Sequence, residues 1–122
     1  KKLKLFVPFI DLFCAVLPTL KDDSSIRPAT KICMFLAKSN HRKNGISLTQ
    51  EQEHNLIEAL IDRLIQDEKV AAKVYAMKAL FVLGKKYDWV HEELKTIISE
   101  DYSNHTAAYQ AATRNLLKKG IK

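Results

Sequence analysis

The sequence contains little that would interrupt regular secondary structure. Only three Gly and three Pro occur among its 122 residues, so we expect long elements with short connections. No stretch shows the sustained alternation of apolar and polar residues that is typical of a half-buried strand. The sequence therefore predicts an all-α fold, and its length fits a single domain covering residues 1–122.

Cysteine is also scarce, and no long hydrophobic run is free of interruption. Cys14 and Cys33 lie far apart, each within an apolar run, so we expect two reduced thiols in the core of a cytoplasmic protein. The apolar segment 3–20 is interrupted by Pro8 and by Asp11, whose charge would be costly at the centre of a membrane span. We therefore expect no signal peptide and no membrane role for this segment.

Motifs of known catalytic and cofactor sites are missing. The four histidines are scattered, and His91-Glu92-Glu93 lacks the second histidine of the zinc-protease pattern. The sequence has no glycine-rich loop that could hold a phosphate and no Gly-x-Ser-x-Gly segment. We therefore expect no catalytic residue, no metal and no cofactor, and we interpret the chain as a non-enzymatic protein.

Acidic residues are absent from three long stretches, residues 24–43, 69–86 and 104–122. These stretches hold most of the 20 Lys and Arg residues, whereas the rest of the chain holds all 14 Asp and Glu residues. If each basic stretch is a helix and the helices stack, one face of the molecule is positive. Together with the net charge of +6, this pattern indicates a binding surface for an anionic partner.

Apolar residues recur with helical periodicity along the whole chain. Leu56, Leu60 and Leu64, each followed by an isoleucine, form one broad stripe, and Thr49 with Gln52 predicts a capping box before it. The pattern predicts six helices, at about 3–20, 25–39, 50–66, 69–86, 89–100 and 104–119.

Several residues are expected at the ends of these helices. Asp88 is a candidate cap of the fifth helix, and Ser103 or Asn104 of the sixth. Gly120 is expected to follow the last helix, and Gly84 is expected to mark fraying or close packing.

A short pattern recurs in the second, fourth and sixth predicted helices. The segments that align are Pro28-Ala29-Thr30-Lys31, Tyr75-Ala76-Met77-Lys78 and Ala111-Ala112-Thr113-Arg114. An apolar pair follows each segment at the same distance: Cys33-Met34, Leu80-Phe81 and Leu116-Leu117. The small residue allows close approach of neighbouring helices, and the apolar pair would fill the layer between them.

The repeat resembles the helical hairpins of HEAT-type α-helical repeat proteins, which form armadillo-like superhelices. The resemblance covers nearly the whole chain, and it is clearest from Asp67 to Leu83. It implies an α-α superhelix of about three HEAT-like hairpins, with the second helix of each hairpin on the concave side. The concave face would then be basic and the convex face acidic. The chain does not begin with Met, which fits a piece of a longer solenoid.

We expect the basic second-helix face to bind the ligand. The candidate binding residues are Arg27, Lys31, Lys38, Lys73, Lys78, Lys85, Arg114 and Lys118. The expected partner is an acidic protein or peptide, because solenoids present extended concave faces. Lys31, Lys78 and Arg114 hold one position of the repeat, so a ladder that pairs with acids of neighbouring helices remains an alternative explanation.

DNA or RNA is the alternative partner for the same face. HEAT-type DNA glycosylases use such a basic groove, but their chemistry also needs aromatic side chains and a carboxylate there. Tyr75 and Tyr109 lie on basic helices, whereas these helices carry no carboxylate. The sequence therefore leaves nucleic-acid binding open and argues against glycosylase activity.

The segment from Ser24 to Lys31 is similar to the mobile catalytic loop of the fumarase/adenylosuccinate lyase superfamily, Ser-Ser-x-Met-Pro-x-Lys-x-Asn. Ser24, Ser25 and Pro28 match, but Arg27 replaces the Met and Lys31 is one position late. Those enzymes are several-fold longer tetramers, so we interpret the similarity as fortuitous and keep lyase activity as a third alternative. A helix capped by Ser24 or Ser25, with Pro28 in its first turn, is the simpler explanation.

Overall fold

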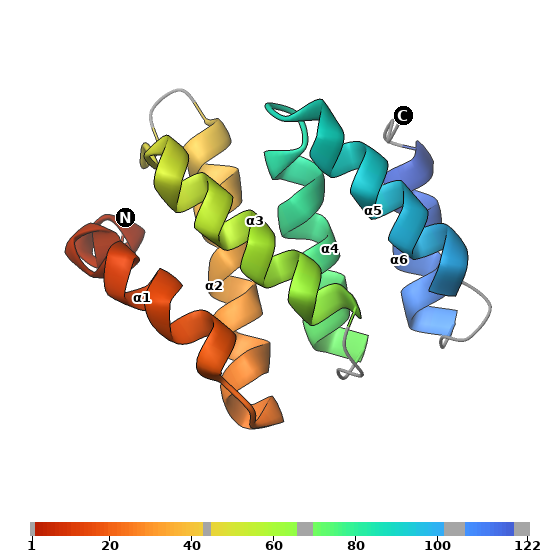
Figure 1. Ribbon diagram of the computed structural model, residues 1–122, viewed down its shortest axis with the longest axis horizontal. Helices are drawn as coiled ribbons and strands as arrows, with labels where there is room; N and C mark the ends of the chain where they lie inside the picture. The colour runs from red at the N-terminus through yellow and green to blue at the C-terminus, as the bar shows by residue number, and fades with distance from the viewer. Residues whose placement is uncertain (1, 43–44, 66–69, 102–106, 119–122) are drawn as a thin grey trace.

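The computed structural model describes residues 2–42, 45–65, 70–101 and 107–118, and Figure 1 shows their arrangement. The elements, with η for a 3-10 helix, are η1 (Lys2–Phe9), α1 (Ile10–Val16), η2 (Leu17–Thr19), α2 (Asp23–His41), α3 (Gln50–Ile65), α4 (Val70–Leu83), α5 (Asp88–Asp101) and α6 (Ala107–Lys118). The described residues form six α-helices and no strand, which confirms the predicted all-α fold. None of these helices is long and apolar enough to span a bilayer.

The helices form two layers (Figure 1). We call α1, α3 and α5 the odd layer and α2, α4 and α6 the even layer, and neighbours within each layer contact one another. α4 is the central helix, because it contacts α2 and α6 in its own layer and α3 and α5 in the other. Its sequence is mostly apolar and has no single apolar face, as expected for a helix that is covered in several directions.

The repeated pattern occupies equivalent positions in the three helices of the even layer. One position of the pattern is buried in every copy: Thr30, Met77 and Thr113. The next position is exposed in every copy: Lys31, Lys78 and Arg114. The alignment made from the sequence therefore matches the observed burial at these two positions.

α3 begins as the sequence predicts. The Gln52 N–H donates to Thr49 Oγ1 and the Thr49 N–H donates to Gln52 Oε1, both at 3.0 Å, which is a capping box. The Gln52 side-chain amide also donates to Asp11 Oδ1 at 2.9 Å. The cap of α3 is thus linked to α1, its neighbour in the odd layer.

The prediction of one continuous helix over residues 3–20 is wrong. The segment is divided into η1, α1 and η2, with Pro8 inside η1 and Pro18 inside η2. Proline has no backbone N–H to donate, so each proline disturbs the hydrogen-bond ladder of an α-helix. This segment also exposes several large apolar side chains: Val7, Phe9, Leu12 and Val16.

The start of α2 differs from the expectation. The backbone N–H groups of Ser25 and Ile26 both donate to the Asp22 carbonyl at 2.9 Å, so Asp22 holds the cap position. Neither Ser24 nor Ser25 is the cap. Pro28 accordingly lies in the second turn of the helix and not in the first.

The start of α5 also differs by one residue from the expectation. Asp88 is the first residue of the helix and not the cap. At this position its carboxylate interacts favourably with the positive end of the helix dipole. The predictions for Ser103, Asn104 and Gly120 fall outside the described residues.

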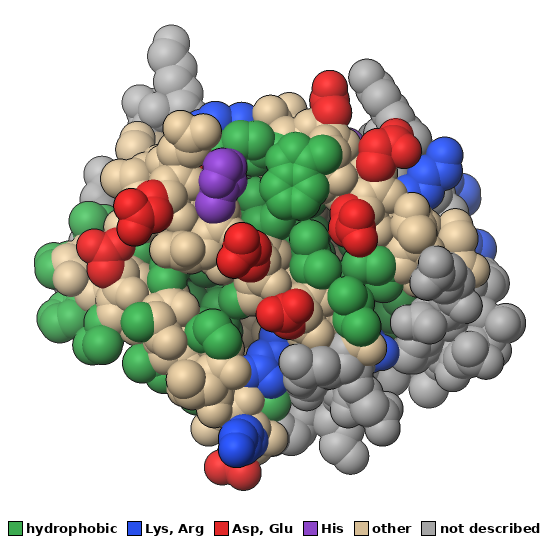
Figure 2. Space-filling model, in the orientation of Figure 1, with side chains coloured by type: hydrophobic (Ala, Val, Ile, Leu, Met, Phe, Trp, Pro, Cys, Tyr) green, Lys and Arg blue, Asp and Glu red, His purple; other side chains and the backbone are tan. Residues whose placement is uncertain are grey.

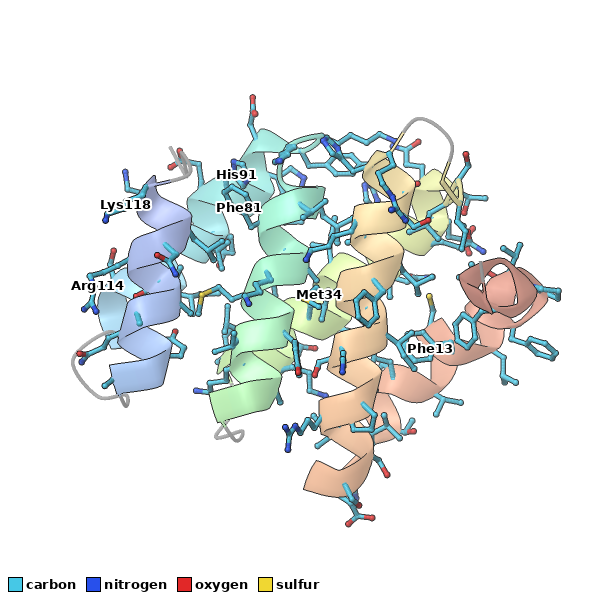
Figure 3. The ribbon with its side chains drawn as sticks, turned by 180° about the vertical axis from the view of Figure 1, so that it is seen from behind. Phe13, Met34, Phe81, His91, Arg114 and Lys118 are labelled. Atoms are coloured by element: carbon cyan, nitrogen blue, oxygen red, sulfur yellow. The ribbon has the colours of Figure 1, made fainter. Side chains whose placement is uncertain are left out.

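Gly84 marks a close approach of α5 to the end of α4, which confirms the expected close packing. A Cβ atom on Gly84 would lie 2.0 Å from Cδ2 of His91. The His91 ring stacks on Phe81 with 5.4 Å between centroids, and its Nε2 lies 2.8 Å from the Phe81 carbonyl oxygen (Figure 3). The ring is therefore held in place, and only glycine leaves room for it.

Candidate functional site

The two layers carry opposite charge on their outward surfaces. Figure 2 shows acidic and hydrophobic side chains over the odd layer. The even layer is seen from outside in Figure 3, where Arg114 and Lys118 lie along α6. Seven of the basic residues predicted to bind the ligand are exposed on α2, α4 and α6 or directly after α4. We call them the basic surface: Arg27, Lys31, Lys38, Lys78, Lys85, Arg114 and Lys118.

Lys73 does not belong to the basic surface, although the sequence grouped it with these residues. Its side chain is only 4% exposed, and it makes contacts within the protein. Lys73 lies five residues before Lys78, a spacing that places it on another side of α4. We therefore exclude it from the site as a correction.

The exposed lysines of α2 and α4 are not engaged with acids of the described residues. Lys31, Lys38 and Lys78 form no ion pair within this part of the chain. The Lys31 Nζ lies 6.0 Å from the centroid of the Phe35 ring, and the Lys85 Nζ lies 5.3 Å from that of Phe81. These two cations thus rest on aromatic rings and leave their charge open to a ligand.

A buried carboxylate at one end of the basic surface was not recognised from the sequence. Glu53 of α3 is 1% exposed and accepts three hydrogen bonds. The donors are Asn40 Nδ2 at 2.7 Å, Lys86 Nζ at 2.9 Å and the Tyr87 hydroxyl at 2.7 Å. Burial by itself raises the pKa of Glu53, but the hydrogen bonds from Tyr87, Lys86 and Asn40 outweigh it and lower the pKa.

The Glu53 cluster shapes the end of the even layer. Asn40 also accepts the Leu48 N–H through its Oδ1 at 2.7 Å, so the connection between α2 and α3 is held against the cluster. A hollow of about 420 Å³ opens beside it, lined in part by His41, Lys85 and Lys86. The sequence did contain a signal for the burial of Glu53. This residue lies on the apolar stripe of Leu56, Leu60 and Leu64, where an acid must be buried.

The remaining candidate residues from the sequence are parts of the core. Cys14 and Cys33 are free and buried, and burial raises the pKa of both thiols, so they stay protonated at neutral pH. Tyr109 is 0% exposed, and Tyr75 is partly buried against the core. Across the described ranges, no three metal-ligating side chains come together.

The segment that is similar to a lyase loop is helical in this structure. Residues 24–31 lie within α2, where the Thr30 hydroxyl donates to the carbonyl oxygens of Arg27 at 2.9 Å and Ile26 at 3.0 Å. The similarity therefore falls on the first turns of a packed helix, while the lyase segment is a mobile loop.

Comparisons of this chain with protein families, with curated proteins and with solved structures find no match. The basic surface is therefore the feature from which we derive a function.

Proposed function

We propose that this chain is a non-enzymatic interaction module that binds an acidic protein or peptide through its basic surface. The observation that carries this proposal is the separation of charge between the two helix layers. Basic side chains are exposed on α2, α4 and α6, and none of these helices has an Asp or Glu after Asp23. Because solvated surfaces usually carry both signs interspersed, a face of one sign supports binding of an anionic partner.

We further propose a HEAT-type solenoid as the architecture. Each helix of the odd layer is followed in the sequence by one of the even layer, as in a stack of hairpins (Figure 1). The common burial pattern of α2, α4 and α6 supports equivalent hairpins. In this proposal the even layer is the concave, ligand-facing side, and the module works in the cytoplasm, where its two free thiols would stay reduced.

A nucleic acid is the second candidate ligand, because phosphates also pair with Lys and Arg. The burial of the tyrosines favours the acidic peptide. Tyr109 is buried and Tyr75 packs against the core, so neither offers an open ring on which a base could stack.

Charge reversal on two neighbouring helices of the even layer tests the proposal. We expect Lys31→Glu/Lys78→Glu to weaken binding of a fluorescent Glu-rich peptide by about tenfold or more, because each new carboxylate repels the ligand. Fluorescence anisotropy at about 50 mM salt measures the affinity, and duplex and single-stranded oligonucleotides are titrated under the same conditions.

A matched control separates the surface from the net charge. Lys21→Glu/Lys95→Glu lowers the net charge of +6 by the same four charges, but Lys21 precedes α2 and Lys95 lies on α5. We expect this variant to keep most of the affinity. An equal loss in both variants would sink the proposal. If the protein binds an oligonucleotide more tightly than the peptide, and only Lys31→Glu/Lys78→Glu loses this binding, the ligand is a nucleic acid and not an acidic peptide.

A further inference from the structure

One exposed aromatic side chain lies among the residues of the basic surface. The large hydrophobic residues that the described part of the chain exposes are Val7, Phe9, Leu12, Val16, Phe35, Ile65 and Trp89. Of these, only Phe35 lies in the even layer, where its side chain is 44% exposed. The other aromatic rings of that layer, including Phe81 and Tyr109, are buried or packed against the core.

Phe35 stands in the middle of the cationic row of α2. The series Arg27, Lys31, Phe35, Lys38 and Arg42 has spacings of four, four, three and four residues, and all five side chains are exposed. This spacing follows one face of an α-helix, so the first four residues lie along the outside of α2, and Arg42 directly follows the last residue of that helix. The aromatic ring therefore has two cations on either side of it.

We propose that Phe35 is an apolar anchor point, and that the acidic ligand carries an apolar side chain among its carboxylates. This inference rests on the proposed function and names the ligand more closely. The Lys31 Nζ lies 6.0 Å from the Phe35 ring centroid, so a carboxylate that pairs with Lys31 arrives beside the ring. An apolar neighbour of that carboxylate then covers the ring and removes both surfaces from water.

The composition of the row favours a peptide over a nucleic acid. Proteins that bind single strands stack successive bases on several aromatic rings, whereas the described even layer exposes a single one. A peptide needs only one apolar contact at the centre of a charged rim, which is the usual layout of a small interface.

Two peptides of equal charge test the inference. One is a Glu-rich peptide with a central leucine, and the other has serine in place of that leucine. We expect the protein to bind the leucine peptide about tenfold more tightly, a ratio that corresponds to one buried apolar contact. We expect Phe35→Ser to remove this preference and to leave the affinity for the serine peptide unchanged.

Trp89→Ser is the matched control, because Trp89 is an aromatic residue of similar exposure, 50%, on α5 in the odd layer. It should keep the tenfold preference, and circular dichroism verifies that both variants are folded. If the unchanged protein binds both peptides equally and Lys31→Glu/Lys78→Glu weakens the binding of both, the role of Phe35 as an anchor is overturned and the proposed function stays intact. If neither peptide binds, both fail. The peptide assignment would also be overturned if a single-stranded oligonucleotide displaces the peptide from the unchanged protein but not from Phe35→Ser.

Discussion

Glu53 connects three parts of the molecule through one buried carboxylate. It lies on α3, while its donors come from α2 through Asn40 and from the connection before α5 through Lys86 and Tyr87. Because these hydrogen bonds lower its pKa despite burial, the ionised form is the one that the fold stabilises. A carboxyl with a lowered pKa stabilises the folded state at pH values above its ordinary pKa. That contribution disappears as the pH falls through the lowered value.

We predict that Glu53→Gln lowers the free energy of unfolding by about 2 kcal/mol at neutral pH, because the neutral amide is a weaker acceptor for buried donors. The difference between Glu53→Gln and the unchanged protein should shrink as the pH falls below 4.5, the ordinary value for Glu, because the unfolded chain then takes up a proton that the folded protein accepts only at lower pH. Urea unfolding at a series of pH values measures both effects.

Glu58→Gln serves as the control for this prediction, because Glu58 is an exposed residue of the same helix. We expect it to change the free energy of unfolding by no more than about 0.5 kcal/mol at any of these pH values. A loss in Glu53→Gln that persists unchanged in acid would contradict the ionised, hydrogen-bonded carboxylate.

At the scale of elements, the divided N-terminal segment depends on a side chain from α3. Arg63 is buried, and its Nη2 donates to the carbonyl oxygens of Leu17 at 2.8 Å and Leu20 at 2.5 Å. Carbonyl groups at the end of a helix lack partners within the helix, so an arginine that reaches them acts as a cap supplied from elsewhere. Arg63 thus holds the end of η2 against the odd layer.

We predict that Arg63→Met lowers the free energy of unfolding by about 1–3 kcal/mol, because it removes the arginine donor from the carbonyl oxygens of Leu17 and Leu20. Amide hydrogen exchange should accelerate most in residues 10–20, since this segment loses its tie to α3. Exchange followed by mass spectrometry locates the change.

Arg27→Met is the control, because it makes the same substitution at an exposed residue of α2. It should leave the hydrogen exchange of residues 10–20 unchanged. A uniform acceleration over all helices in Arg63→Met would show instead that Arg63 stabilises the whole fold and not this segment.

The elements also show which features could be predicted from the sequence. The all-α fold, the capping box of Thr49 and Gln52 and the repeat register depend on residues close together in the chain, so local patterns were sufficient. The Glu53 cluster and the Arg63 cap depend on contacts between residues 13 to 46 positions apart. No local pattern specifies such partners. The position of Lys73, in contrast, follows from its five-residue spacing from Lys78, which places the two residues on different sides of one helix.

At the scale of the whole molecule, the charge separation has two possible explanations, cohesion of the stack or binding of a ligand. Cohesion requires that the lysines of the even layer pair with acids of neighbouring helices. Lys31, Lys38 and Lys78 do not do so in the described part of the chain, and the exposed acids gather on the odd layer (Figure 2). The charge of these three lysines is therefore left unpaired within the described part of the chain.

We predict that Lys31→Glu/Lys78→Glu changes the free energy of unfolding by no more than about 1 kcal/mol, because exposed charges contribute little to stability. The lower net charge reduces repulsion among the basic residues, which offsets the loss of the contact between Lys31 and Phe35. Urea unfolding measures this value, with Lys21→Glu/Lys95→Glu as the variant of equal charge. A loss of about 3 kcal/mol or more, found only in Lys31→Glu/Lys78→Glu, would show that these lysines hold the hairpins together. The basic surface would then be explained by cohesion, and the proposed binding function would lose its basis.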